Sequence, residues 1–191
     1  MFHERIKSAT TTDHQNAEKH SYGKEIMSRT LTKDQYGHLL IANYRYIKPW
    51  EDQWSETTFD TTALQLDMRK KTSLLEDDMR SLGIDPTKIE TTPLETSASY
   101  AEFMGRMYVI EGSTMGGAVI VKQLGLNPNL EGLSFKFYGG YGPDLLNNWR
   151  SFLGVLNTIE NKTDQDIAIE SAKATFNAMK ECFIQAKTAQ V

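Results

Sequence analysis

Three glycines, Gly112, Gly116 and Gly117, fall within residues 108–120, a stretch that otherwise has the apolar spacing of a helix and contains no proline. Glycine in a helix interior costs about 1 kcal/mol relative to alanine, so three of them cost about 3 kcal/mol out of a usual stability of about 5–15 kcal/mol. Two explanations fit such a cost: two helices that pack closely, or a bent helix that lies across a flat ligand. The stretch alone leaves both explanations open.

The composition is that of one ordinary soluble domain, which we expect to span residues 1–191, with 39% apolar and 24% charged residues. A net charge of −4 argues against general nucleic-acid binding, and the single cysteine, Cys182, excludes an internal disulfide. The N-terminus lacks the apolar core of a signal peptide, and the most apolar run, residues 115–121, is too short to span a membrane. We therefore expect a cytoplasmic protein without membrane contact and, because no apolar stripe exceeds the needs of one core, a monomer.

A second candidate feature lies in the helix expected over residues 4–19. His14 lies on the apolar stripe that begins with Ile6, and Glu18 follows one helical turn later, so the two polar side chains can meet. A metal-bound imidazole normally donates its other N–H to an acceptor such as a carboxylate, and this pair supplies both parts. A histidine on an apolar stripe is more often a core residue, so spacing alone does not decide between the two roles.

Helical periodicity and capping signals predict further helices over residues 23–29, 32–50, 64–82, 99–124, 143–156 and 164–183. Met68, Leu146 and Ile167 are among the residues expected to face the core, whereas the run Arg69-Lys-Lys71 has the character of a solvated face. No segment gives a convincing strand. The prediction is an all-α, single-domain helical bundle.

Two motifs together resemble the haem oxygenases. The run Ile6-Lys-Ser-Ala-Thr10-Thr-Thr-Asp-His14-Gln-Asn-Ala-Glu18 is similar to the family's proximal-helix pattern. The run Tyr108-Val-Ile-Glu-Gly-Ser-Thr-Met-Gly-Gly117 is similar to the glycine-rich distal helix of its bacterial members. Weaker similarities follow at residues 74–83, 137–138, 149–150 and 172–176, so the resemblance spans nearly the whole chain.

The resemblance implies a bundle of the haem oxygenase type, with haem b between the first helix and a kinked, glycine-rich distal helix. His14 would be the iron ligand, and Glu18 would hold its other ring nitrogen. Gly112, Gly116 and Gly117 would bring the distal backbone close over the other haem face. The implied reaction uses O2 and electrons from a ferredoxin or reductase, and converts haem to biliverdin, carbon monoxide and free iron.

The resemblance also assigns residues around the haem edge. Lys7 and Arg150 would pair with haem propionates, Tyr108 would approach a propionate, and Phe176 would contribute to haem binding. The alternative is that Lys7 and Arg150 are solvated surface charges. Ser113 stands where animal members carry an aspartate that organises the distal water; Ser113, Thr114 or a backbone carbonyl could take its place.

Two other functions fit parts of the pattern. A haem carrier or sensor without turnover would use the same histidine and glycine helix, and the serine at position 113 keeps this alternative open. A thiaminase-like hydrolase would share the all-α fold but needs a nucleophilic cysteine in mid-chain. Cys182 lies near the end of the last expected helix, which argues against the hydrolase.

Overall fold

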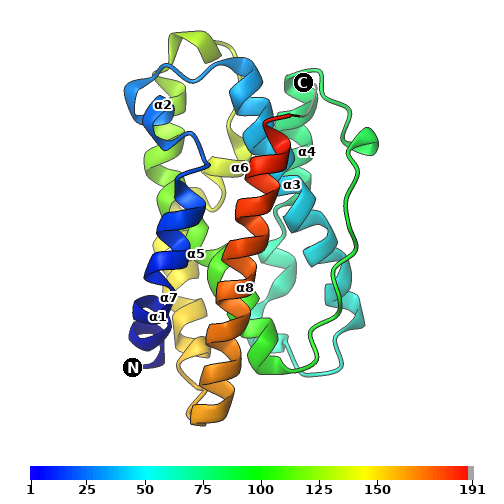
Figure 1. Cartoon of the computed structure of the whole chain (residues 1–191), viewed down its shortest axis with the longest axis vertical. Helices are drawn as coiled ribbons and strands as arrows, with labels where there is room; N and C mark the ends of the chain where they lie inside the picture. Colours follow the sequence, from blue (N-terminus) through cyan, green and yellow to red (C-terminus); the bar gives the residue numbers. More distant parts are fainter. Residues whose placement is uncertain (189–191) are drawn as a thin grey trace.

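The computed structural model of the chain describes residues 1–188, which form eight α-helices and six short 3-10 helices, with no strand in that range. The α-helices are α1 (Phe2–Glu18), α2 (Gly23–Ser28), α3 (Lys33–Asp52), α4 (Thr72–Ser81), α5 (Tyr100–Gly125), α6 (Lys136–Gly139), α7 (Leu145–Leu156) and α8 (Lys162–Ala186). The 3-10 helices are η1 (Gln53–Glu56), η2 (Thr62–Leu64), η3 (Leu66–Arg69), η4 (Pro86–Lys88), η5 (Pro128–Leu130) and η6 (Gly142–Asp144). The longer helices follow the long axis of the molecule (Figure 1). The predicted all-α single domain is confirmed.

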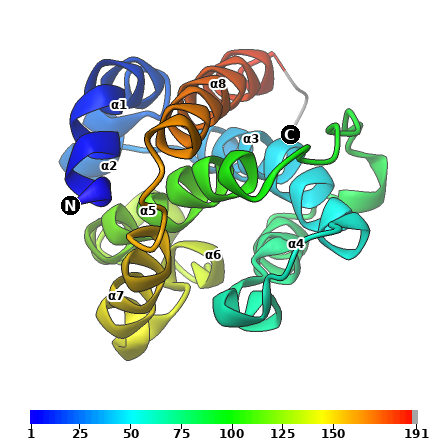
Figure 2. The same cartoon turned by 90° about the horizontal axis from the view of Figure 1, so that it is seen from below.

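Helix α5 occupies the middle of the bundle, with α1, α3 and α8 on one side and α4, α6 and α7 on the other (Figure 2). Its contact with α8 is very close. A Cβ placed on the buried Gly105 would lie 2.2 Å from the carbonyl oxygen of Ala168 and 2.8 Å from the Cβ of Ser171. Only glycine allows this separation of the two helices, so Gly105 is a packing glycine that the sequence pattern did not single out.

Capping residues fix where the two central helices begin. Thr32 and Gln35 form a capping box, because Thr32 Oγ1 accepts from the Gln35 amide at 3.2 Å and Gln35 Oε1 accepts from the Thr32 amide at 3.0 Å. Ser99 caps α5 by accepting from the Glu102 amide at 3.2 Å. The starts of α3 and α5 were therefore readable from local sequence.

Residues 64–82 do not form the single helix that was predicted. Gln65 adopts a left-handed conformation with φ of 51°, which separates η2 from η3 and changes the direction of the side chains that follow. Met68, predicted to be inward, is consequently 68% exposed. Arg69 and Lys71, predicted to be solvated, are only 3% and 4% exposed because both meet the carboxylate of Glu111 on α5.

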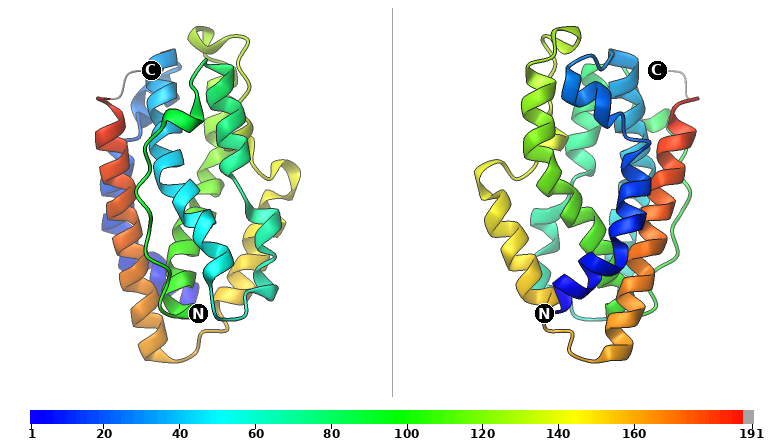
Figure 3. Two further views of the ribbon diagram at one scale, coloured as in Figure 1. Left: turned by 90° about the vertical axis from the view of Figure 1, so that its right-hand side faces the viewer. Right: turned by 60° about the vertical axis from the view of Figure 1, so that its left-hand side comes forward.

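Leu146 and Ile167 are exposed as well, contrary to the prediction that they face the core. Leu146 lies in the first turn of α7, where the chain projects from the side of the bundle, and Ile167 lies near the start of α8, which extends beyond its neighbours (Figure 3). The same views show that α5 changes direction part-way along its length. Among the described residues, no helix is long and apolar enough to cross a membrane.

Candidate functional site

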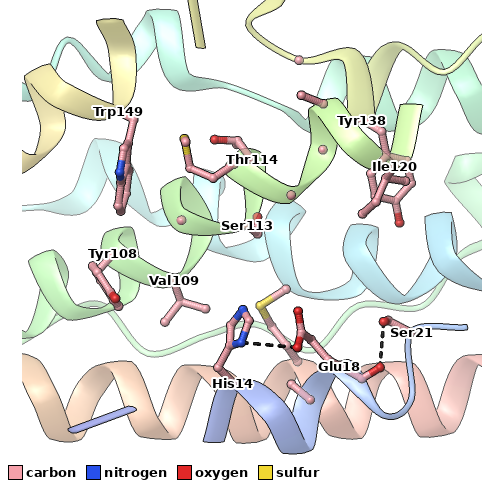
Figure 4. Close-up of a pocket in the computed structure, with 18 of the residues that line it drawn as sticks. His14, Glu18, Ser21, Tyr108, Val109, Ser113, Thr114, Ile120, Tyr138 and Trp149 are labelled. Atoms are coloured by element: carbon pink, nitrogen blue, oxygen red, sulfur yellow. Dashed lines mark hydrogen bonds and ion pairs between the residues drawn. The ribbon is translucent and has the colours of Figure 1, made fainter. Parts of the chain in front are cut away.

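A cavity of about 950 Å³ lies between α1 and α5 and is closed at its sides by α6, α7 and α8 (Figure 4). Most of the site residues predicted from the sequence line it: Lys7, His14, Glu18, Tyr108, Gly112, Ser113, Gly116, Gly117 and Phe176. Arg150 is the exception, because its side chain is exposed and lies outside the lining. Residues that are about a hundred positions apart in the sequence therefore converge on one cavity.

His14 and Glu18 form the pair expected on α1. The Nδ1 atom of His14 lies 3.5 Å from Oε2 of Glu18, and the His14 side chain is 52% exposed (Figure 4). Phe176 of α8 packs edge-to-face against the imidazole, with ring centres 5.4 Å apart. Because Nδ1 faces the carboxylate, Nε2 is the ring nitrogen left for a ligand in the cavity.

The three glycines of α5 play different roles on the opposite wall. A Cβ on Gly116 would meet nothing within 4 Å, and one on Gly112 would only touch Trp149 at 3.7 Å. A Cβ on Gly117 would lie 2.7 Å from the carbonyl oxygen of Tyr138, which no side chain tolerates without a backbone shift. Close packing therefore accounts for Gly117, which permits the approach of α5 to α6, whereas Gly116 leaves open space beside the cavity.

The two hydroxyl side chains between these glycines bond to their own helix. Ser113 Oγ donates to the carbonyl of Ile110 at 2.7 Å, and Thr114 Oγ1 donates to the carbonyl of Glu111 at 2.6 Å. Such bonds to the preceding turn favour bending of a helix, as seen in α5. With their protons committed, both hydroxyls have only lone pairs to offer a cavity water.

Tyr108 lies on the same wall, with its ring centre 6.1 Å from the ring centre of Trp149. Burial raises the pKa of the Tyr108 phenol, and a hydrogen bond with Thr10 of α1 acts in the opposite direction. The phenol is therefore protonated at neutral pH and ties α5 to α1 at the cavity. Lys7, one helical turn before Thr10 and Thr11, is an exposed lining residue and supplies a positive charge at the cavity edge.

Sequence reasoning missed a buried charge cluster directly behind α5. Arg69 and Lys71 both pair with Glu111, and Tyr141 donates its hydroxyl proton to the same carboxylate at 2.8 Å. The signal was present in the sequence, since Glu111 is an acidic residue within an apolar helix and such a residue requires a buried partner. Its partners are 42, 40 and 30 residues away, so spacing did not identify them.

A cavity of cofactor size between a histidine-bearing helix and a glycine-bearing helix, in an all-α domain, defines a class of helical cofactor-binding proteins. The model of the family described as "Heme oxygenase" matches residues 1–185, and the chain belongs to this family. The predicted fold and the predicted enzyme class, a haem oxygenase, are confirmed.

Relatives and solved structures agree with this assignment. The chain is 28% identical to a heme oxygenase of Xanthomonas campestris over 154 residues, which are 80% of this chain and 90% of the relative. It is 23% identical to the heme oxygenase PigA of Pseudomonas aeruginosa over 175 residues, covering 91% and 87% of the two chains.

The fold is likewise shared with solved structures. The heme oxygenase structure from Leptospira interrogans superposes with a TM-score of 0.80 at 17% identity, over 96% of this chain and 98% of that one. The Neisseria meningitidis heme oxygenase, described with NO and CO bound, gives 0.76 at 22% identity, over 100% and 94%. At these identities the structural likeness speaks for the fold alone.

Proposed function

We propose that this chain opens haem b oxidatively in the cavity between α1 and α5, with Nε2 of His14 as the iron ligand. The observation that carries the proposal is the opposition of His14 on one wall and the open face of Gly116 on the other. A flat macrocycle fits between them because Gly116 leaves the space that any Cβ would occupy.

The chemistry of the lining fits haem better than a bare metal ion. Among residues 1–188, no group of three or more histidine, cysteine, aspartate or glutamate side chains could hold a metal. A single imidazole with a carboxylate behind it is instead a suitable axial ligand for an iron already held by a porphyrin. Phe176 and Trp149 supply the apolar contact that such a ring needs.

Bound haem supplies the oxygen chemistry, and the protein positions it and excludes competing reactions. Glu18 orients the His14 imidazole through their contact. Lys7 offers a cation to a propionate at the cavity edge, with Arg150 as a second, more remote candidate. Gly112 and Gly116 leave room on the distal side, while Ser113 and Gly117 complete that wall.

The remaining expectations belong to the same proposal. The reaction uses O2 and electrons from an external ferredoxin or reductase, and it releases biliverdin, carbon monoxide and iron. We also propose that the protein acts as a cytoplasmic monomer. A hydrolase that uses Cys182 has no support, because this residue lies outside the cavity lining and burial raises its thiol pKa, which disfavours the reactive thiolate.

A spectroscopic titration tests this function and separates it from a haem carrier. Purified protein is titrated with haemin, and a reductant is then added in air while the visible spectrum is followed. The proposal requires a Soret band typical of histidine ligation that decays as a broad biliverdin band grows at longer wavelength. Stable bound haem that never degrades identifies a carrier, and absence of haem binding overturns the site.

A further inference from the structure

Burying the charged side chains of Arg69, Lys71 and Glu111 costs free energy of folding. Glu111 is only 1% exposed and pairs with Arg69 and with Lys71, whose Nζ lies 2.7 Å from Oε1 of Glu111. Replacing buried ion pairs with apolar residues is often neutral or stabilising, so such clusters are weak contributors to stability. Glu111 directly precedes Gly112, which lines the cavity, so the cluster lies where it can act on the cavity.

The cluster is also unbalanced, because two cations face one carboxylate. Glu51 lies close to Lys71, but its carboxylate accepts from the backbone amides of Lys71 and Thr72 at 2.5 and 3.2 Å, at the start of α4. A negative charge there compensates the helix N-terminus. Glu51 therefore balances part of the charge from a greater distance, while Arg69 and Lys71 share Glu111 as their close carboxylate among the described residues, in an interior where charge is poorly screened.

Tyr141 links the cluster to the cavity, since it belongs both to the cavity lining and to the cluster. Its hydroxyl donates to both oxygens of Glu111, at 2.8 and 3.0 Å, and accepts from Lys71 Nζ at 3.1 Å. The Lys71 ammonium also lies 4.9 Å from the centre of the Tyr141 ring. Burial and the adjacent Glu111 carboxylate raise the pKa of the Tyr141 phenol, so it stays protonated.

We propose that Arg69, Lys71, Glu111 and Tyr141 form an electrostatic element that stabilises negative charge on the α5 side of the haem cavity. This inference rests on the proposed function. Lys71 supplies the second positive charge, Tyr141 bonds to Lys71 and Glu111 and itself lines the cavity, and Arg69 and Glu111 hold Lys71 in position. The element gives the distal side a charged partner that Ser113 and Thr114, bonded to their own helix, do not provide.

Fluoride affinity of the ferric haem complex tests this inference, because fluoride is an anion whose binding changes the visible spectrum. The variants are Lys71→Met and Tyr141→Phe. The matched controls are Lys70→Met, an exposed neighbour that pairs with Asp67 at 2.8 Å, and Tyr44→Phe, whose hydroxyl donates to Glu76 at 3.4 Å away from the cavity. Both lysine variants change the net charge equally, so only the position of the charge differs.

Lys71→Met is expected to weaken fluoride binding about tenfold, the size of effect that one poorly screened charge produces. Tyr141→Phe should weaken it by a smaller factor, and both controls should match the parent. Affinity of the ferrous complex for carbon monoxide, a neutral ligand, should stay unchanged in all four variants. Equal fluoride affinity in the parent and Lys71→Met overturns the inference, as does a parallel loss of carbon monoxide affinity, which would indicate a damaged cavity.

The two levels of proposal fail in different ways. If the parent binds haemin and fluoride but never degrades haem, the proposed turnover is wrong, and the fluoride contrast still decides the role of the cluster. If the parent degrades haem while Lys71→Met and Tyr141→Phe retain its fluoride affinity, the proposed function stands and the inference is overturned. A parent that binds no haemin overturns both.

Discussion

Gly117 and Tyr138 lie so close that a Cβ on Gly117 would stand 2.7 Å from the carbonyl oxygen of Tyr138. This contact sets the distance between α5 and α6, and α6 forms one side of the cavity. The adjacent Gly116 has no atom within 4 Å of the position a Cβ would take. Two neighbouring glycines in one helix therefore serve different purposes.

Alanine at these two positions should change stability in opposite directions. Gly117→Ala forces a backbone shift in α6, and we expect a loss of about 1–3 kcal/mol, the usual cost of overpacking. Gly116→Ala meets open space and should gain about 0.5–1 kcal/mol from the higher helix propensity of alanine. Urea unfolding of the two variants and the parent measures both changes. A Gly117→Ala variant as stable as the parent would mean that the α5–α6 contact does not constrain Gly117, and a loss in Gly116→Ala would mean that the space beside Gly116 is not open.

The sequence predicted that the glycines are costly but left their purpose open, and the reason is physical. Spacing along a helix identifies which residues share a face, but the atom opposite that face comes from a distant segment. Tyr138 of α6 is such a partner, and so is Ala168 of α8 for Gly105. The His14–Glu18 pair was predictable because both residues lie on one helix, one turn apart.

The buried charge cluster was not predicted, because its members also come from distant segments of the chain. Arg69 and Lys71 have the composition of a solvated face, and only the break at Gln65 and the position of Glu111 on α5 turn them inward. A left-handed non-glycine residue carries no reliable sequence signal, so the predicted helix over residues 64–82 was too long. The sequence therefore indicated residues that line the cavity but not the charged cluster next to them.

A bulky side chain at the open glycine should affect the cavity rather than the fold. Gly116→Leu extends a branched side chain into the space above His14, so we expect slower haem degradation with at most a small change in unfolding free energy. Single-turnover kinetics with bound haem and a urea transition are the two measurements. Unchanged turnover would show that the distal space at Gly116 is not used.

Removal of the proximal imidazole should be specific and reversible. His14→Ala removes the iron ligand that we propose on α1, so the histidine-type Soret band and turnover should be lost. Added imidazole should restore the band, because the emptied space can hold a free ring. His20→Ala is the control, since His20 follows α1 and lies outside the cavity lining. A His14→Ala spectrum identical to that of the parent would exclude His14 as the ligand.

The two cations proposed for the propionates can be told apart by their positions. Lys7 lines the cavity and Arg150 does not, so Lys7→Met should change the ratio of biliverdin isomers more than Arg150→Met. Haem affinity should fall by less than about fivefold in either variant, because exposed ion pairs contribute only about 0–1 kcal/mol. Isomers are separated chromatographically after turnover. Equal shifts in both variants would place Arg150 in the haem site.

The cavity wall formed by α6 depends on Asp78 of α4. The buried Asp78 carboxylate accepts from the backbone amides of Lys136 and Phe137, at 3.0 and 2.9 Å, and from the hydroxyl of Tyr36 at 3.2 Å. It thereby holds the start of α6 against the bundle and satisfies donors that would otherwise be buried without a partner.

Asp78→Ala should therefore destabilise the protein by about 3 kcal/mol or more, since each unsatisfied buried donor costs about 1–3 kcal/mol. Asp77→Ala is a matched control, because the neighbouring Asp77 is exposed and pairs with Lys136 Nζ at 2.8 Å. Its loss should cost no more than about 1 kcal/mol. Urea midpoints compare the two variants, and haem affinity should fall only in Asp78→Ala, because α6 carries part of the cavity lining. Similar midpoints would show that α6 is held in place by its contact with Gly117 rather than by the Asp78 carboxylate.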